Sequence, residues 1–112
     1  MFRSFHAQYL FFRTRLKDTV LFFQAGNFLE LYDQDAVDLA PALGLEIKEN
    51  FRGMRWAAGF PIRLERKFMD KALSLGRDAA VVNEGITGWL VKDRQVREIY
   101  RVLEKSSSAV QA

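Results

Sequence analysis

The feature that most constrains the fold is the stretch at residues 19–32, TVLFFQAGNFLELY, where a continuous apolar run ends at a Gly-Asn pair and restarts as an alternating segment. The run at residues 20–23 is short, uninterrupted and rich in β-forming side chains. It therefore predicts a strand buried on both faces in the middle of a sheet. Gly26 and Asn27 then supply the positive-φ residues that allow a sharp turn.

Beyond that turn the side chains alternate with a period of two. Leu29 and Leu31 point one way, while Phe28, Glu30 and Tyr32 point the other. If the leucines face the core, an aromatic ring and a carboxylate stand side by side in solvent. A register slip of one residue would instead bury Phe28, and the pattern alone favours a core position for that ring. Glu30 argues against the slip, because an unpaired carboxylate on the buried face would cost several kcal/mol.

The charge of the chain indicates what such a pair of side chains would contact. A net charge of +3 and a pI near 9.4 favour anionic partners. Phosphates repel a carboxylate, so Glu30 suits a nucleic-acid surface only if it accepts a hydrogen bond from a base edge. Phe28 has a matching use as an apolar wedge, which unstacks a base step for about a few kcal/mol and least at a mispaired step.

The seven residues 26–32, GNFLELY, resemble the G-D-F-Y-E-L-F signature of the mismatch-recognition domain that opens MutS-type mismatch-repair proteins. In that family the Phe of the Phe-x-Glu motif wedges beside the mispaired base and the Glu hydrogen-bonds it. The matching positions in this chain are Phe28 and Glu30. Asn27 stands where the family usually has Asp, and Leu29 stands where it has an aromatic residue.

The resemblance continues in order along most of the chain. Residues 57–61, AAGFP, resemble the family's M-A-G-I-P turn, a helix-like segment follows them, and residues 79–84 resemble its A-I-C-E strand. Three ordered matches are much more specific than a lone Phe-x-Glu. The resemblance implies the fold of MutS domain I.

Length and composition fit one α/β domain. The chain has 112 residues, 49% of them hydrophobic, with ten Phe, two Trp and no Cys. It is long enough and apolar enough for a compact core, and thiolate metal sites and disulfides are excluded. No apolar stretch reaches the length of a membrane span, so we expect a cytoplasmic protein. We expect a domain at residues 1–104 and a flexible tail at 105–112.

Local patterns place the remaining elements. Ser4 is a candidate cap for a helix at residues 5–16 with a stripe of Phe5, Tyr9, Phe12 and Leu16, and its basic flanks favour a solvated surface over a membrane-binding or DNA-binding face. Asp33 is a candidate cap for the next helix, which we expect to kink or end near Ala40 because of Pro41, with Gly44 as its stop. Further predicted elements are paired strands at residues 45–50 and 54–58, a turn at 59–61, a helix at 63–75 with a stripe of Leu64, Phe68, Ala72 and Leu75, a buried strand at 78–83, and strands at 89–91 and 96–103, the last at an edge. Together they predict a single compact domain with a mixed β-sheet flanked by helices.

Catalysis finds little support in the sequence. Glu30, Asp33 and Asp35 would in principle hold a divalent ion for phosphodiester hydrolysis, but Asp33 already has a use as a helix cap and Asp35 falls in the first turn. No G-x-x-x-x-G-K-[ST] phosphate loop occurs, so the ATPase of MutS-type proteins is absent from this chain. We therefore predict a protein that is not an enzyme and needs no cofactor.

Two functions remain open. The first is a DNA-binding module that probes duplexes for mispaired or deformable steps, with double-stranded DNA and a separate ATPase or repair protein as partners. The second is an accessory or protein-interaction subunit of a nucleic-acid complex that keeps the fold without reading mismatches. The DNA-binding residues expected under the first are the wedge, the base contact, the turn that presents them and the nearby cations, namely Phe28, Glu30, Gly26, Asn27, Lys48, Arg52 and Arg55.

Overall fold

The protein is built on one mixed β-sheet. The computed structural model describes residues 2–86 and 91–103. Within these residues the sheet has six strands in the order β3-β4-β2-β1-β5-β6. The elements in chain order are α1 (Phe5–Arg15), β1 (Thr19–Ala25), β2 (Phe28–Tyr32), α2 (Asp33–Leu43), β3 (Lys48–Phe51), β4 (Met54–Pro61), the 3₁₀ turn η1 (Ile62–Leu64), α3 (Glu65–Ser74), β5 (Asp78–Glu84) and β6 (Arg94–Tyr100).

The predicted central strand is confirmed, because β1 lies between β2 and β5 and is buried along nearly its whole length. It pairs antiparallel with β2 and parallel with β5. Val20 and Phe22 face one side of the sheet, while Leu21 and Phe23 face the other. This alternation creates two hydrophobic cores that share the same strand.

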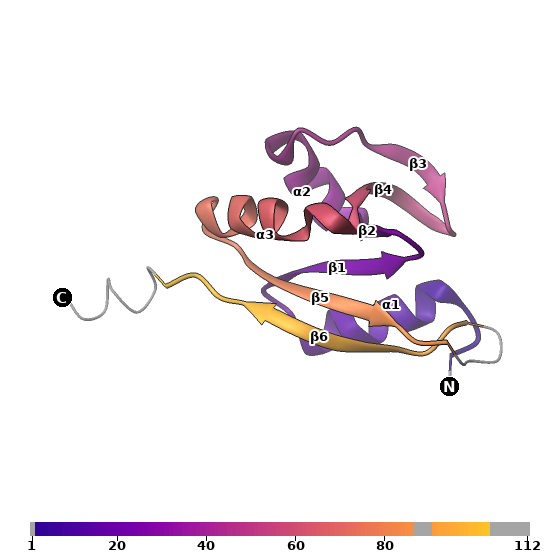
Figure 1. Cartoon of the computed structure of the whole chain (residues 1–112). Coiled ribbons are helices and arrows are strands. Elements are labelled where there is room, and N and C mark those ends of the chain that lie inside the picture. The colour runs from indigo at the N-terminus through magenta and orange to yellow at the C-terminus, as the bar shows by residue number, and fades with distance from the viewer. Residues whose placement is uncertain (1, 87–90, 104–112) are drawn as a thin grey trace.

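Helices cover both sides of the sheet. The α2–α3 core consists of the residues that pack around Phe22, Leu29, Leu31, Leu39 and Met69. The α1 core consists of those around Tyr9, Phe12, Leu21, Phe23 and Tyr32. Figure 1 shows α2 and α3 on one side of the strands and α1 on the other. The predicted α/β fold with a mixed sheet flanked by helices is therefore confirmed.

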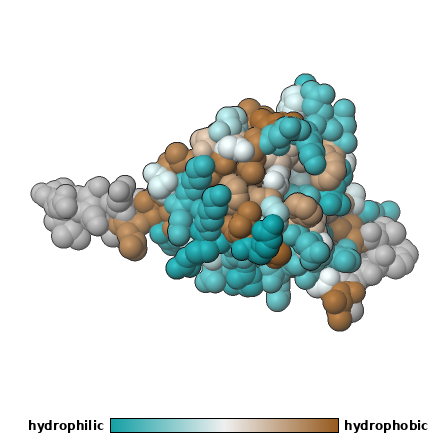
Figure 2. Space-filling view, turned by 45° about the horizontal axis from the view of Figure 1, so that its top comes forward, coloured by the Kyte–Doolittle hydropathy of each residue, from teal (hydrophilic) through white to brown (hydrophobic). Residues whose placement is uncertain are grey.

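Each helix packs part of its apolar surface against the sheet. Figure 2 brings the α2–α3 side of the molecule forward and shows hydrophilic and apolar side chains interspersed on it. The candidate cap of α1 is confirmed, because Ser4 Oγ accepts a hydrogen bond from Ala7 N at 3.0 Å. Tyr9 and Phe12 of its predicted stripe are buried, and Phe5 and Leu16 pack beside them. None of the described helices is both long and apolar enough to cross a membrane.

The start of α2 and the effect of Pro41 differ from the prediction. Asp33 does not cap it, because its backbone is left-handed (φ 51°) and its Oδ1 accepts from Arg55 N and Trp56 N of β4 at 3.1 and 3.4 Å. The helix also continues past Pro41 to Leu43 instead of ending near Ala40, and Gly44 ends it as predicted. A proline near a helix end removes one backbone hydrogen bond, and packing of the last turn in the α2–α3 core offsets that loss.

The expected turn at residues 59–61 is wrong, since these residues are the end of β4. Gly59 pairs with Glu30 and Phe60 pairs with Leu29, so the segment is an inner strand rather than a loop. The helix that follows begins at Glu65 after η1, and Met69 rather than Leu75 joins Phe68 and Ala72 in its buried face. Leu75 comes after α3 and is 45% exposed.

The remaining strands follow the predicted pattern with shifted ends. β5 is buried over its first five residues, and β6 pairs with it antiparallel as an edge strand. The pairing of β3 with β4 is confirmed, although β3 begins three residues later than expected. The predicted strand at 89–91 falls mostly, and the predicted tail at 105–112 wholly, outside the described residues.

Candidate nucleic-acid interface

The turn between β1 and β2 presents Phe28. Ala25 pairs with Phe28, which leaves Gly26 and Asn27 as a two-residue loop. Gly26 has a φ of +60°, whereas the φ of Asn27 is not positive. The turn therefore has one residue with positive φ where two were expected. Asn27 O accepts a hydrogen bond from Ile62 N at 2.8 Å, which ties the loop to η1.

The ring of Phe28 is exposed. Phe28 is the first residue of β2 and 46% of its surface is accessible, in contrast to the other four residues of the strand, which are buried. It shares the α1 side of the sheet with Glu30 and Tyr32. The helix covers only the Tyr32 end of that side, so exposure rises along β2 from Tyr32 toward Phe28. The interpretation that placed the leucines inward and this ring outward agrees with the structure.

Glu30 is not in solvent, which corrects the expectation for its side chain. It is 6% exposed and lies opposite Gly59, where an added Cβ would come within 2.9 Å of Glu30 Cγ. A glycine at that position thus leaves the space that the glutamate side chain occupies.

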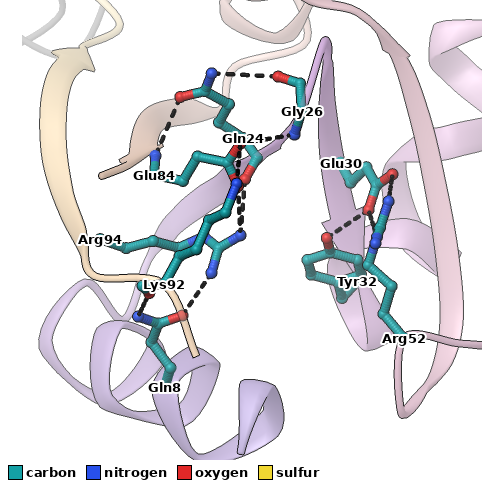
Figure 3. A network of polar contacts seen from close by, with 9 residues as sticks. All are labelled: Gln8, Gln24, Gly26, Glu30, Tyr32, Arg52, Glu84, Lys92 and Arg94. Atoms are coloured by element: carbon teal, nitrogen blue, oxygen red, sulfur yellow. Dashed lines mark hydrogen bonds and ion pairs between the residues drawn. The ribbon is translucent and has the colours of Figure 1, made fainter. Parts of the chain in front are cut away.

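Two donors converge on one oxygen of this carboxylate. Tyr32 donates its hydroxyl to Glu30 Oε1 at 2.6 Å, and Arg52 donates Nε to the same oxygen at 2.7 Å. Among the described residues, the one hydrogen bond to Oε2 is a long one from the Arg52 guanidinium, at 3.4 Å. Figure 3 shows Tyr32 and Arg52 both pointing toward Glu30. Since a carboxylate oxygen accepts about two hydrogen bonds, Oε1 is occupied and Oε2 retains acceptor capacity.

The ionisation of the neighbouring groups follows from this geometry. Burial, and then the negative charge of Glu30, raise the pKa of the Tyr32 hydroxyl far above its usual range. The hydrogen bond to Glu30 raises the pKa of Arg52. Tyr32 is therefore a neutral donor and Arg52 a cation, and both hold the carboxylate in one orientation.

The turn between β3 and β4 positions Arg52. Phe51 pairs with Met54, and the two residues between them, Arg52 and Gly53, have φ values of +53° and +74°. Positive φ at both central residues is the geometry that fits the twist of a hairpin. The Arg52 side chain is 41% exposed, and its guanidinium carbon lies 4.9 Å from the centre of the Phe51 ring.

The structure brings four of the expected residues to one hollow of about 240 Å³. Phe28 and Glu30 line it from β2, and Lys48 and Arg52 line it from β3 and its turn. Small residues of β4, including Ala57 and Gly59, also line the hollow. Arg55 is not part of it; this residue is exposed on β4 near Trp56 and borders a different hollow.

A second network, which sequence reasoning missed, supports the turn that carries Phe28 (Figure 3). Glu84 Oε1 accepts from Gly26 N at 2.9 Å, and the Gln24 side chain bonds both Gly26 O and Glu84 N. Arg94 donates to Glu84 Oε2 at 3.2 Å and to Gln24 O at 3.0 Å, and its other terminal nitrogen donates to Gln8 Oε1 of α1 at 2.8 Å. The only sequence signal was a carboxylate at the end of a buried strand, which does not reveal a partner 58 residues away.

The three acids considered for a metal site do not form one. Glu30 is bound by Arg52 and Tyr32, Asp33 by backbone N–H groups of β4, and Asp35 by Arg13 and Leu21 N. Among residues 2–86 and 91–103, no group of three His, Cys, Asp or Glu side chains is placed to hold a metal ion.

Comparison with known proteins decides the family. A family model described as MutS domain I matches residues 3–109. The chain belongs to the MutS domain I family. The family assignment made from the GNFLELY segment is therefore confirmed.

Individual relatives agree with this membership. The DNA mismatch repair protein MutS of Thermus thermophilus is 37% identical over 79 residues, which cover 69% of the chain and 10% of that protein. The corresponding protein of Treponema pallidum is 33% identical over 103 residues, or 88% of the chain and 11% of that protein. That of Borrelia hermsii is 29% identical over 96 residues, or 86% of the chain and 11% of that protein. The chain thus spans about a tenth of the length of the curated relatives that it matches.

Proposed function

We propose that this MutS domain I protein is a DNA-binding module of mismatch repair that tests duplex steps with Phe28 and Glu30. The observation that carries the proposal is the exposed Phe28 ring at the rim of a hollow that also contains Glu30. The relatives are named DNA mismatch repair proteins, and this agrees with such a role. The module itself supplies recognition, and a separate ATPase or repair protein acts with it.

Phe28 is the wedge in this proposal. An apolar side chain inserted between base steps costs about a few kcal/mol of unstacking, and a mispaired step resists least. The ring is carried by a tight turn that Glu84, Gln24 and Asn27 hold through hydrogen bonds. A rigid support matters because a mobile ring would lose conformational entropy on insertion.

Glu30 is the base contact. Its Oε2 is the carboxylate oxygen with acceptor capacity left, and Glu30 lines the same hollow as Phe28. An N–H donor on a base edge would complete this oxygen's hydrogen bonds. The pair with Arg52 places the carboxylate and offsets part of its repulsion from phosphates.

The nearby cations serve as phosphate contacts. Lys48 and Arg52 line the hollow, and Arg55 is exposed on the adjacent strand. Charge-dominated binding by so small a module is weak, in the range of about 1 to 100 μM at physiological salt.

The Glu30–Arg52 pair also favours a second candidate function. A carboxylate that already accepts hydrogen bonds from an arginine and a tyrosine is satisfied without a nucleobase. In an accessory subunit that keeps the fold without reading mismatches, this pair would be purely structural.

Fluorescence anisotropy on matched and single-mismatch duplexes at fixed salt separates the two functions. We expect the parent protein to prefer the mismatch by about fivefold or more, equivalent to about 1 kcal/mol. Phe28→Ala removes the preference without changing the salt slope, because the ring neutralises no phosphate. Glu30→Gln reduces the preference, since a neutral amide oxygen is a weaker acceptor.

A matched control is Phe11→Ala. It removes an exposed phenylalanine on α1 instead of the one on β2, and it should leave the mismatch preference intact. Equal affinity of the parent for both duplexes would support the accessory role instead.

A further inference from the structure

A second hollow, of about 650 Å³, lies beside the turn that carries Phe28. Its lining includes Gly26 of that turn and Phe5 at the start of α1. Figure 1 shows the β1–β2 turn, the tip of the β3–β4 hairpin and the start of α1 at the same end of the molecule. Four cations from three parts of the chain line it, and we call it the basic cleft: Arg3, Arg52, Lys92 and Arg94.

The charges of the basic cleft do not cancel. Glu84 is the only acid among the described residues that line it, and it is bound by Arg94 at 3.2 Å and approached by Lys92 at 3.8 Å. Glu30 pairs with Arg52 from the neighbouring hollow. Four cations therefore face two carboxylates, and Arg3 has no ion-pair partner within the described part of the chain.

Arg94 forms the inner wall. Its side chain is only 5% exposed, and its guanidinium carbon lies 4.8 Å from the Phe5 ring centre and 5.6 Å from that of Phe23. Its Nε has no hydrogen-bond partner among the described residues. Glu84 offsets the charge of Arg94, so the excess positive charge of the cleft lies at its mouth, where Arg3 and Lys92 are exposed.

We propose that the basic cleft binds a backbone phosphate of DNA next to the step that Phe28 contacts. Gly26 lines the cleft and Phe28, two residues further along the turn, lines the adjacent hollow, so their Cα atoms are at most about 7 Å apart. Phosphates along one strand follow each other every ~3.4 Å of helix axis, so the bound phosphate lies one or two nucleotides from that step. Arg52 lines both hollows, so it lies between the hollow proposed for the base and the cleft proposed for the phosphate.

The inference takes DNA as the partner from the proposed function but needs neither the wedge nor the base contact. A phosphate contact weakens binding equally for all sequences when it is removed, whereas a base contact changes the preference between sequences. The two ideas can thus fail separately.

The test measures the salt dependence of binding to matched and mismatched duplexes for Arg3→Gln, Lys92→Gln and the double variant. Loss of the contact to this one phosphate reduces the slope of log K against log salt by about 0.9, so we expect that fall in the double variant and part of it in each single variant. Affinity for the two duplexes falls by the same factor, so the mismatch ratio is unchanged. Both side chains are exposed, and circular dichroism will show that the variants are folded.

The matched control is the pair Arg15→Gln and Lys17→Gln. These remove the same charges at the other end of α1, about 16 Å along an 11-residue helix. The control pair should keep the parent slope. If the Arg3 and Lys92 variants behave like the control pair, the basic cleft does not bind DNA and the inference is wrong.

Two further probes distinguish the source of the anion. Inorganic phosphate, followed by NMR shifts of residues around Gly26, should bind far more weakly than DNA, and polyglutamate should not compete at equal charge concentration. Tight, Arg3-dependent binding of either probe would overturn the assignment to a DNA backbone. If the parent protein shows no mismatch preference but the Arg3 and Lys92 variants still have a smaller salt slope than the parent, the cleft binds DNA and mismatch reading is rejected.

Discussion

At the scale of single residues, the orientation of Glu30 depends on side chains that are far apart in sequence. Arg52 is 22 residues away, and Gly59, which leaves room for the glutamate, is opposite on β4. Alternation along β2 correctly placed Phe28 and Glu30 on the same side. The alternation gave no information on the partner of the carboxylate. An arginine in an exposed turn, such as Arg52, is common and does not by itself indicate an ion pair.

The hydroxyl of Tyr32 is the clearest test of this arrangement. Tyr32→Phe removes one buried hydrogen bond to a charged acceptor, so we expect the free energy of unfolding to fall by about 1.5–3 kcal/mol. Glu30 then turns more freely, and the mismatch preference should fall as well. Chemical denaturation and duplex anisotropy measure the two effects.

Tyr100→Phe is the matched control, because Tyr100 donates to Glu65 Oε2 at 2.8 Å in the same way at a different site. We expect it to lower stability without altering the mismatch preference. A loss of preference in both variants would mean that general destabilisation, not the position of Glu30, controls recognition.

At the scale of elements, the strongest patterns were also the most local ones. The continuous runs of β1 and β5 and the aromatic stripe of α1 are set by burial of successive side chains, which a sequence displays directly. Asp33, expected as a helix cap, and residues 59–61, expected as a turn, were misassigned because tertiary pairing overrode these local propensities. The carboxylate of Asp33 binds β4 rather than its own helix, and Gly59 is required opposite Glu30.

Arg13 links the end of α1 to α2 and to the start of β1. Its guanidinium pairs with Asp35 of α2 at 2.8 Å and donates to the carbonyls of Leu16, Lys17 and Thr19. Arg13→Met leaves Asp35 buried without its counter-charge, so we expect a loss of about 3–5 kcal/mol at pH 7. Asp35→Asn in the same chain should recover part of that loss, because the two changes are coupled.

The cost of Arg13→Met should depend on pH. Burial raises the pKa of Asp35, and the Leu21 N–H and Arg13 only partly offset that effect. A carboxyl with a raised folded-state pKa stabilises the fold at low pH and loses that contribution as pH rises from about 3.8, the ordinary value. Without Arg13 the pKa rises further, so denaturation at pH 4 should show a smaller cost than at pH 7. A cost that grows toward pH 4 would contradict this account.

At the scale of the whole molecule, the two cores share one sheet and so have no boundary along which they could separate. Val20 and Phe22 belong to the α2–α3 core, while Leu21 and Phe23 of the same strand belong to the α1 core. Loss of packing on either side therefore weakens β1, on which both depend. A domain of this size is expected to unfold in one cooperative step.

Matched leucine truncations test this coupling. Leu21 faces the α1 core, Leu31 faces the α2–α3 core, and both are fully buried. We expect Leu21→Ala and Leu31→Ala each to cost about 2–5 kcal/mol. The fluorescence of Trp56, which packs against the α2–α3 core, should follow the same transition as far-UV circular dichroism in both variants when Trp89 is replaced by Phe.

The decisive variant is Leu21→Ala, because its cavity and the Trp56 reporter lie on opposite sides of the sheet. If the dichroism transition shifts while the Trp56 transition stays at the parent midpoint, α1 and its core unfold separately. The network from Gln8 through Arg94 to the Phe28 turn would then be the first contact that the module loses, and mismatch preference would decline at denaturant concentrations below the main transition.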